Sequence, residues 1–347
     1  MTRKSPLLQL VHARVLVFLR EPATLFWVFL FPVILALVLG MAFRDRPPEP
    51  PRIGVVTGIA SSATLHDIYA KSARVHLAEA PAEELQRKLD KGAIDVIVGL
   101  DEAGAATYHF DPQRAEARLA RLVVDEELQR HYGRADPVTI SERTEMPRGA
   151  RYIDFLLPGL IAMNLMGSAL WGVGYGMVAE RSKKLMRRFA TTPLSRTQFI
   201  ASYIISRLAF LALEVAFLIG FGALVFDVEV QGNVGLLMLV ALLGVMCFTG
   251  FAVLCASRTA SVEVVSGFVN ALTLPMWLLS GTFFSYERFP EVLQPIIRVL
   301  PLTALNDALR AITNDGAGVA AIAPQLAILA GWGTVTFVIG VRLFRWK

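Results

Sequence analysis

Apolar residues along the chain gather into six long runs, and the stretches between these runs carry most of the charge. A helix rises 1.5 Å per residue, so about 20 apolar residues cross the ~30 Å hydrocarbon core of a bilayer. Each run reaches this length, and the first lacks the small-residue cleavage site of a signal peptide. The pattern therefore predicts six transmembrane helices, at 23–43, 155–179, 199–226, 234–256, 264–284 and 322–341.

Residues 44–150 follow a different pattern, in which short apolar stretches alternate with helical ones and charges of both signs are mixed. Gly92 is typical of a helix end, and Asp111 is the expected N-cap of a long helix. Apolar alternation predicts strands at 52–58, 73–80, 93–100, 106–110 and 137–145, and helices at 63–73, 81–92 and 111–134. These elements predict a small α/β domain inserted after the first span.

Two further stretches have the pattern of amphipathic helices lying beside the membrane. Residues 1–22 predict an interfacial helix that leads into the first span. Residues 280–316 are too polar for a span and too apolar for a free loop, which predicts two short helices at about 286–313. The expected fold class is an α-helical polytopic membrane protein with six transmembrane helices and an inserted small α/β extracytoplasmic domain.

Composition and charge agree with this class and give an orientation. Hydrophobic residues make up 54% of the chain and the mean hydropathy is +0.52, both above the values usual for soluble domains. Counted over the termini and short loops, 14 Lys and Arg residues lie on one side of the expected spans and 3 on the other. Basic loops stay in the cytoplasm, so both termini are expected there and the α/β domain outside. Because these charges flank membrane spans, nucleic-acid binding is not favoured.

Motif absences limit the chemistry that the chain can perform by itself. The sequence contains no G-x-x-x-x-G-K-[ST] phosphate loop, no G-x-S-x-G elbow and no H-E-x-x-H zinc motif. Cys247 and Cys255 lie in one expected span, which argues against a disulfide or metal site. We therefore expect no enzymatic activity from this chain alone; any transport would draw on an ion gradient or on a partner.

The most basic segment of the chain lies between the second and third expected spans. The stretch ERSKKLMRRFATTPLSRTQF, residues 180–199, holds six positive charges. Read as a helix, it places Leu185, Met186 and Phe189 on one face and Arg181, Lys184 and Arg188 on another, before Pro193 ends the helix. Such a helix can fix topology, lie on anionic lipid or insert its apolar side chains into a groove of a partner.

Polar residues within the expected spans are candidates for a transport pathway. Glu214 lies midway along the third span, where a charge facing lipid costs at least about 2.5 kcal/mol. It should therefore face protein or a water-filled cavity. Asn164, Asn270 and Thr273 are weaker candidates, and interhelical hydrogen bonding is the alternative role for all four. Gly172 and Gly176 form a small-xxx-small face that predicts close helix packing.

Four stretches together resemble the membrane subunits of type-2 ABC exporters, in the subgroup with a large extracytoplasmic domain after the first span. They are FLREPATLFWVFLFPVILALVLG, ERSKKLMRRFATTPLSRTQFIAS, LLSGTFFSYERFPEVL and LPLTALNDALRAI. The resemblance covers essentially the whole chain, and the order and spacing of the stretches are more specific than any one of them.

The resemblance implies a function. In this family the loop between spans two and three is a coupling helix that docks on a separate ATPase, here at about 180–194. The residues it implicates are Glu180, Arg181, Lys184, Leu185, Met186, Arg188, Phe189, Pro193 and Leu194. The family often has an acidic residue and a glycine soon after the first Glu, whereas RSKK follows Glu180 here.

The same resemblance implies the partners and location of the chain. It would bind no cofactor itself, whereas the partner ATPase would hold ATP and magnesium. A second permease copy or a paralogue would complete the pathway in a bacterial cytoplasmic (inner) membrane, surrounded by lipid. A periplasmic partner for the outer domain is a separate expectation that the resemblance does not supply.

Two other classes of function remain open from the residues alone. An ion-coupled secondary transporter should show inverted repeats, broken helices and more paired intramembrane charges, of which the sequence shows little. A membrane-anchored sensor or assembly protein would use the α/β domain as its receptor and would not depend on ATP. Changes in the basic segment separate the classes, because only an ATPase-coupled permease should lose function there.

Overall fold

The computed structural model of the 347-residue chain describes residues 6–44, 49–58, 61–101, 105–134, 149, 151–183, 196–259 and 261–343. It divides into two compact units, and each is described by itself. The helical unit comprises Met1–Asp45 and Met146–Lys347, and the α/β unit comprises Arg46–Glu145.

Among the described residues, six helices of the helical unit are long and apolar enough to cross a membrane, which confirms the number predicted from the apolar runs. The first contains α2 (Pro22–Leu25), the π-helix η1 (Phe26–Leu30) and α3 (Phe31–Ala42). The second contains α7 (Tyr152–Ala169), the π-helix η2 (Leu170–Tyr175) and α8 (Gly176–Ser182). The others are α10 (Arg196–Phe226), α11 (Val234–Ala256), α12 (Val262–Leu279) and α15 (Ala323–Leu343).

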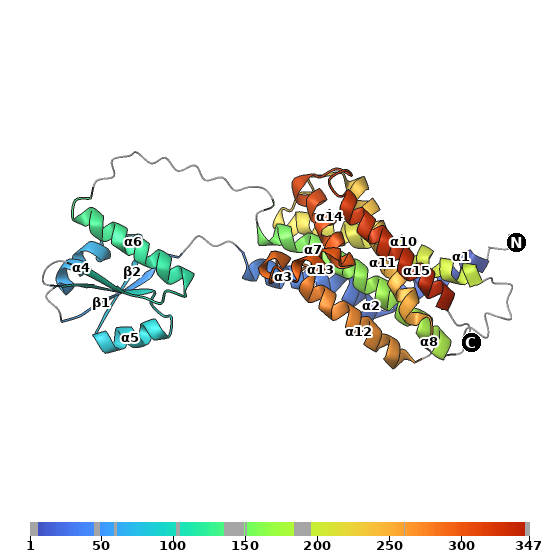
Figure 1. The fold of residues 1–347 in the computed structure, drawn as a ribbon, viewed down its shortest axis with the longest axis horizontal. Helices are drawn as coiled ribbons and strands as arrows, with labels where there is room; N and C mark the ends of the chain where they lie inside the picture. Colours follow the sequence, from blue (N-terminus) through green and yellow to red (C-terminus); the bar gives the residue numbers. More distant parts are fainter. Residues whose placement is uncertain are drawn as a thin grey trace. The chain divides into compact units, whose positions relative to one another are not determined.

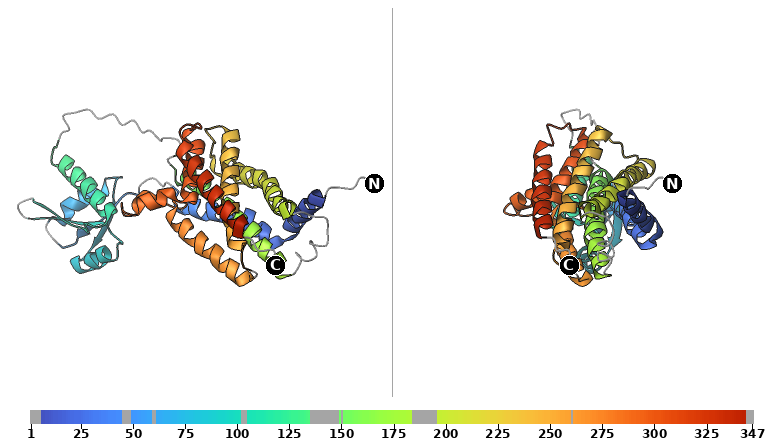
Figure 2. Two further views of the ribbon diagram at one scale, coloured as in Figure 1. Left: turned by 45° about the vertical axis from the view of Figure 1, so that its right-hand side comes forward. Right: turned by 90° about the vertical axis from the view of Figure 1, so that its right-hand side faces the viewer.

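Two of these six helices form the centre of the unit. In the second span 83% of the most apolar window is buried, and in α11 the share is 67%, whereas the other four spans have 17–33%. Seen end-on, α7 (green) and α11 (gold) lie between α15 (red) and α1 (blue), as the right-hand view of Figure 2 shows. The second span and α11 are therefore the structural core, and the outer faces of the other four are left for lipid or a partner.

Shorter helices complete the helical unit. They are α1 (Pro6–Arg20), the 3₁₀ turn η3 (Tyr286–Arg288), α13 (Gln294–Val299) and α14 (Pro301–Asp315). The fifth span ends at Leu279 rather than at the predicted residue 284, because the chain turns at Gly281, whose φ is +71°. Helix α14 is not an exposed surface helix: most of its residues are buried, and it packs against α7, α11 and α15.

The described part of the α/β unit contains one four-stranded sheet with helices on both faces (Figure 1). The strand order is β2-β1-β3-β4, in which β1 pairs in parallel with β2 and β3, and β4 pairs antiparallel with β3. Helices α4 and α6 share a core with one face, and α5 shares a core with the other. The elements are β1 (Arg52–Val56), α4 (Ser62–Ala70), β2 (His76–Ala80), α5 (Ala82–Asp90), β3 (Val96–Leu100), β4 (Ala106–His109) and α6 (Ala115–His131).

Local chemistry explains most of these boundaries, with one correction. Helix α5 begins after Pro81 and is followed by Gly92 at φ +68°, as the sequence predicts. Helix α6 begins at Ala115 with Arg114 as its N-cap, so the predicted cap at Asp111 is wrong. The Asp111 carboxylate instead accepts a hydrogen bond from the Gln113 N–H, 2.9 Å away, which forms a local turn before the helix. The strand predicted at 137–145 lies outside the described residues.

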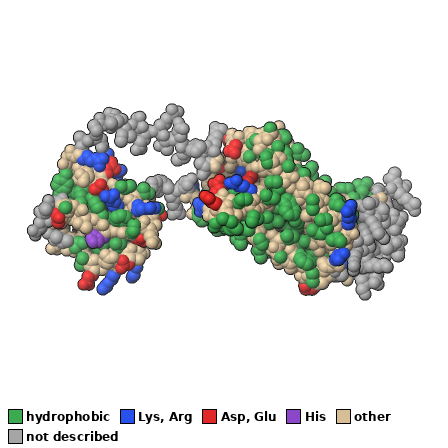
Figure 3. Space-filling model, viewed as in Figure 1, with side chains coloured by type: hydrophobic (Ala, Val, Ile, Leu, Met, Phe, Trp, Pro, Cys, Tyr) green, Lys and Arg blue, Asp and Glu red, His purple; other side chains and the backbone are tan. Residues whose placement is uncertain are grey.

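Side-chain chemistry on the visible face of the helical unit follows its helices. Hydrophobic side chains cover the length of the helices, and charged side chains gather towards the two ends (Figure 3). Because lipid tails accept apolar side chains and reject charges, this distribution fits helices that cross a bilayer.

Candidate functional site

A buried ion pair lies within α10, inside the third span. The Arg207 guanidinium donates two hydrogen bonds to the Glu214 carboxylate, with NH1 2.6 Å from Oε1 and NH2 2.7 Å from Oε2. The two side chains are 6% and 1% exposed. Seven residues make about two helical turns, so both project from the same face of α10. The charge of Glu214, the residue singled out from the sequence, is therefore balanced by Arg207 on the same helix.

Ser168 of α7 connects this pair to the second span. Its hydroxyl accepts a hydrogen bond from Arg207 NH2 and donates to the backbone oxygen of Asn164, 2.6 Å away. The same hydroxyl lies 3.4 Å from Glu214 Oε2. The side-chain Nδ2 of Asn164 is buried without a hydrogen-bond partner among the described residues. Ser168, Arg207 and Glu214 therefore form a polar cluster, named here the α7–α10 cluster, between two spans.

The α7–α10 cluster lies beside a change in helix type. The π-helix η2 begins at Leu170, two residues after Ser168, and a π-helical turn is rare in proteins and frequent at functional sites. Segment η2 packs against α11 and α12, and Gly174 lies close to Ala252 of α11. The cluster contains neither a nucleophile paired with a base nor an arrangement for binding phosphate. It can hold α7 and α10 in one register, or exchange its hydrogen bonds when the helices move.

The other predicted residues of the spans do not join this cluster. Thr273 is buried in α12, and its hydroxyl has no hydrogen-bond partner among the described residues. Asn270 is exposed on the same helix. Gly176 packs against the ring of Tyr203, at 3.3 Å from an added Cβ, whereas an added Cβ at Gly172 would meet no atom within 4 Å. The small-xxx-small pair therefore makes one close contact in this chain, at Gly176.

Sequence reasoning missed Arg207 and Ser168. The signal for Arg207 was its spacing, since an opposite charge seven residues before Glu214 falls on the same helical face. Ser168 gave no comparable signal, because a serine in an apolar helix usually bonds to its own backbone. Only the packing of α7 against α10 shows that Ser168 also accepts a hydrogen bond from Arg207.

Two residues at the end of α8 anchor the start of the predicted coupling segment. Glu180 accepts hydrogen bonds from both terminal nitrogens of Arg14 in α1, at 3.0 and 3.2 Å. Arg181 is buried, and its NH1 donates to the backbone oxygens of Ala256 and Thr259 at 2.8 and 2.5 Å. Arg181 thus holds the α11–α12 turn of its own chain, and its expected contact with a partner stays a prediction. The remaining predicted coupling residues lie outside the described part of the chain: Lys184, Leu185, Met186, Arg188, Phe189, Pro193 and Leu194.

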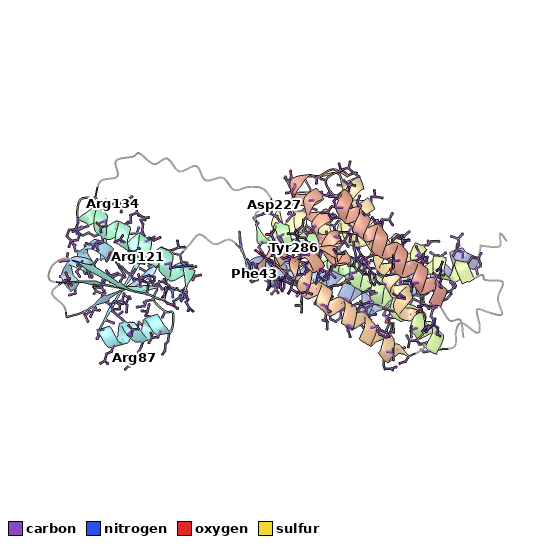
Figure 4. The ribbon with its side chains drawn as sticks, viewed as in Figure 1. Phe43, Arg87, Arg121, Arg134, Asp227 and Tyr286 are labelled. Carbon is purple, nitrogen blue, oxygen red and sulfur yellow. The ribbon has the colours of Figure 1, made fainter. Side chains whose placement is uncertain are left out.

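A second polar group lies at the opposite end of the helical unit, near Tyr286 and Asp227 in Figure 4. Arg310 of α14 donates from Nε to the backbone oxygen of Phe155, 3.0 Å away, and from NH2 to that of Gly281. Its guanidinium carbon also lies 3.6 Å from the centre of the Phe155 ring. Arg310 therefore fastens α14 both to α7 and to the turn after α12.

Asp307 lies one turn before Arg310, and burial raises the pKa of its carboxyl to about 6. The positive charge of Arg310 and the hydrogen bond that the Tyr286 hydroxyl donates at 3.4 Å act in the opposite direction but do not cancel the effect of burial. Arg298 and Glu287 are the other charged groups that act on this carboxyl. Asp307 therefore changes charge near neutral pH.

The raised pKa of Asp307 predicts that the helical unit gains stability as the pH falls from about 7 to 5. An unfolded aspartate has a pKa of about 3.9, so the folded state binds more protons over this range. Protonation of Asp307 thus adds roughly 1–3 kcal/mol to the free energy of unfolding. This contribution is complete below about pH 4 and is lost as the pH rises through 6. Asp307→Asn does not titrate, so its melting temperature in detergent should change less between pH 5 and 7.

Asp315→Asn is the control for this measurement, because Asp315 is exposed at the end of the same helix. It should keep the pH dependence of the unchanged protein. If Asp307→Asn keeps it as well, the titrating group is elsewhere and the prediction is wrong.

No described group of three or more His, Cys, Asp or Glu side chains is arranged to hold a metal ion. Within the α/β unit, His66 Nδ1 lies 2.7 Å from the Glu79 carboxylate on the surface, a local contact between two side chains.

Comparisons with known proteins extend these observations. A profile of the family described as "ABC-2 family transporter protein" matches residues 22–342. The inner membrane transport permease YhhJ of Escherichia coli (strain K12) is 26% identical over 187 residues, which are 54% of this chain and 48% of that protein. Nodulation protein J of Rhizobium meliloti is 24% identical over 202 residues, 57% of this chain and 75% of that protein.

A third relative is the linearmycin resistance permease protein LnrN of Bacillus subtilis, 23% identical over 186 residues, 53% of this chain and 46% of that protein. The matched region thus spans about half the length of YhhJ and of LnrN. Two of these three relatives, YhhJ and LnrN, are named as permeases.

Proposed function

The chain belongs to the ABC-2 family of transporter proteins, and from this premise we propose that it is the permease subunit of an ATP-driven exporter. The observation that carries the proposal is the family match over residues 22–342. This region contains the first five candidate spans completely and the sixth as far as Arg342. A chain with six spans and no phosphate-binding loop needs an energy source elsewhere, and a separate ATPase subunit supplies it. ATP and magnesium bind to that partner.

The coupling element of this proposal is the segment 180–194. It connects the second span, which ends with α8, to the third span, which is α10. The start of the segment is held firmly, since Glu180 is bound by Arg14 and Arg181 holds the turn between α11 and α12. Movement of the segment by an ATPase would therefore be transmitted to the central span and to α11 and α12.

The transport cycle that follows uses two permease copies, or this chain and a paralogue, with a pathway between them. ATP brings two ATPases together, both coupling segments move, and the spans alternate between inward and outward access. The excess of Lys and Arg in the loops on one side of the spans supports a cytoplasmic position of both termini in a bacterial inner membrane. The α/β unit then lies outside, where it meets a partner.

Co-purification tests this proposal directly. The protein is purified from native membranes in mild detergent, and accompanying proteins are identified by mass spectrometry. An ABC ATPase should accompany the unchanged protein and be lost from the double variant Leu185→Glu with Phe189→Glu. Two buried carboxylates in an apolar contact leave charges without partners, which costs several kcal/mol and removes most of the complex.

A matched control is the double variant Leu119→Glu with Leu122→Glu. These leucines are 64% and 55% exposed on α6 of the α/β unit, far along the chain from the coupling segment. This control should keep the ATPase. If no ATPase accompanies the unchanged protein under any gentle condition, the proposed function is wrong, and ion-gradient transport or a sensor role takes its place.

A further inference from the structure

Arg14 of α1 contacts residues at the start of the coupling segment and beyond its end. At the start of the segment, its two terminal nitrogens donate to the two carboxylate oxygens of Glu180. After the segment, its Nε donates to the Ser202 hydroxyl at 3.0 Å. Its guanidinium carbon lies 3.3 Å from the centre of the Tyr203 ring. One side chain of α1 thus meets α8 and α10, the two helices that the coupling segment joins.

The guanidinium of Arg14 contacts its neighbours through all three of its nitrogens and through its flat face. A planar fork fits a carboxylate with two parallel hydrogen bonds, leaves Nε for a third acceptor, and presents its face to an aromatic ring. Arg14 makes all three contacts, and its side chain is only 13% exposed. A lysine would keep the charge but could not form the fork, the third hydrogen bond and the ring contact together.

Other contacts hold α1 to α10 without Arg14. The rings of Phe18 and Phe210 stack with their centres 3.9 Å apart, and α1 packs against α10. The ion pair with Glu180 adds a link from α1 to the end of the second span. Gly176 of α8 also packs against the Tyr203 ring of α10, so loss of Arg14 should leave α1 on α10 and loosen α8 rather than free it.

We propose that Arg14 is a positioning residue that makes α1, the end of α8 and the start of α10 one moving body. This rests on the proposed function, because the body includes both ends of the coupling segment. A push on the segment then moves α1 together with the second and third spans. Without Arg14 the link between α1 and the end of the second span is lost, so ATP hydrolysis no longer drives these helices together.

Spin labels measure this link in the permease itself, before any partner is added. His12 and Lys183 are exposed positions on α1 and just after α8, and both are changed to cysteine for labelling. The native Cys247 and Cys255 are replaced by alanine in this background. Electron paramagnetic resonance should give one narrow distance distribution with Arg14 present. Arg14→Ala should lose that single narrow distribution.

Three further variants separate positioning from folding. Arg20→Ala removes an exposed charge from the same helix and should keep the narrow distribution. Arg14→Lys should give a distance distribution whose width lies between those of the unchanged protein and Arg14→Ala. Arg14→Glu should lose the narrow distribution, and adding Glu180→Arg to it should restore a large part. A narrow distribution in Arg14→Ala, or no recovery in the charge swap, would overturn the proposal.

The complex with the co-purified ATPase then tests the consequence for coupling. When ATP and vanadate trap the complex, labels at the exposed position His12 in the two permease copies should change their separation. Arg14→Ala should retain the ATPase and its hydrolysis but lose this change. If no ATPase co-purifies, the proposed function fails while the result in the free permease still decides the role of Arg14. If Arg14→Ala shows the unchanged response to trapping, Arg14 does not position the segment.

Discussion

Replacing Glu214 by leucine is expected to destabilise the helical unit far more than replacing Glu214 and Arg207 together. The single change leaves the Arg207 guanidinium, 6% exposed, without its carboxylate inside a transmembrane helix. Breaking a buried pair in this way typically costs about 3–5 kcal/mol, because the remaining charge is desolvated and uncompensated. The double change Arg207→Leu with Glu214→Leu removes both charges and should be close to neutral, since apolar replacements of buried pairs often are.

Thermal unfolding in detergent, followed by circular dichroism, measures this difference. Arg207→Leu alone should be nearly as damaging as Glu214→Leu. Glu229→Leu is the control, because Glu229 is exposed beyond the end of α10 and surface changes usually stay within about 0.5 kcal/mol. If the double variant is less stable than either single variant, hydrogen bonds of the α7–α10 cluster matter more than its charge balance.

The same variants distinguish a structural role of the pair from a role in transport. A charge-free double variant that folds and keeps its ATPase, yet no longer changes conformation with ATP, would assign the α7–α10 cluster to the transport cycle. A variant that folds and responds normally would leave the cluster as an interhelical fastening. The latter result would also weaken ion-coupled transport, which would need a titrating group of this kind within the membrane.

The spans were predictable from the sequence because crossing a bilayer imposes a length and an apolar composition. Which spans lie at the centre was not predictable, because lipid tails are as apolar as a packed helix interface. The central second span has a mean hydropathy of 1.6, whereas the peripheral first span has 2.6. Hydropathy therefore locates spans but does not order them from core to periphery.

The candidate site was predictable in part, for reasons that differ between residues. Glu214 stands out because a charge in an apolar run needs a partner, and its partner could have been sought at helical spacing. Asn164 joins the cluster through its backbone oxygen, which no sequence pattern reports. Arg14 and Glu180 are 166 residues apart, and only the packing of α1 beside α8 and α10 brings them together. The apolar face formed by Leu185, Met186 and Phe189 stays a prediction.

Local competition explains the error at the start of α6. Asp111 is followed by Pro112, a residue well suited to the first position of a helix, so a cap at Asp111 was a reasonable prediction. The carboxylate instead closes a turn on Gln113, and the helix begins four residues later at Ala115. Short polar side chains can satisfy backbone N–H groups in either arrangement, and sequence alone does not choose between them.

Close contact between α11 and α15 predicts a second large effect, from adding a side chain at Gly340. A Cβ at this position would lie 2.8 Å from the backbone N of Leu254 and 3.1 Å from its Cα. Backbone atoms cannot swing aside as a side-chain end can, so α15 has to move away from α11. Gly340→Val should therefore destabilise the helical unit by about 1–3 kcal/mol or more, the usual range for overpacking.

Gly331→Val is the matched control on the same helix, because an added Cβ at Gly331 would meet no atom within 4 Å. It makes the same chemical change and removes the same flexible residue, so it should be neutral or slightly stabilising. The difference in melting temperature between the two variants then measures the α11–α15 contact alone. Equal melting temperatures would mean that α15 can shift at little cost, and that its fit against the core span α11 does not hold the bundle together.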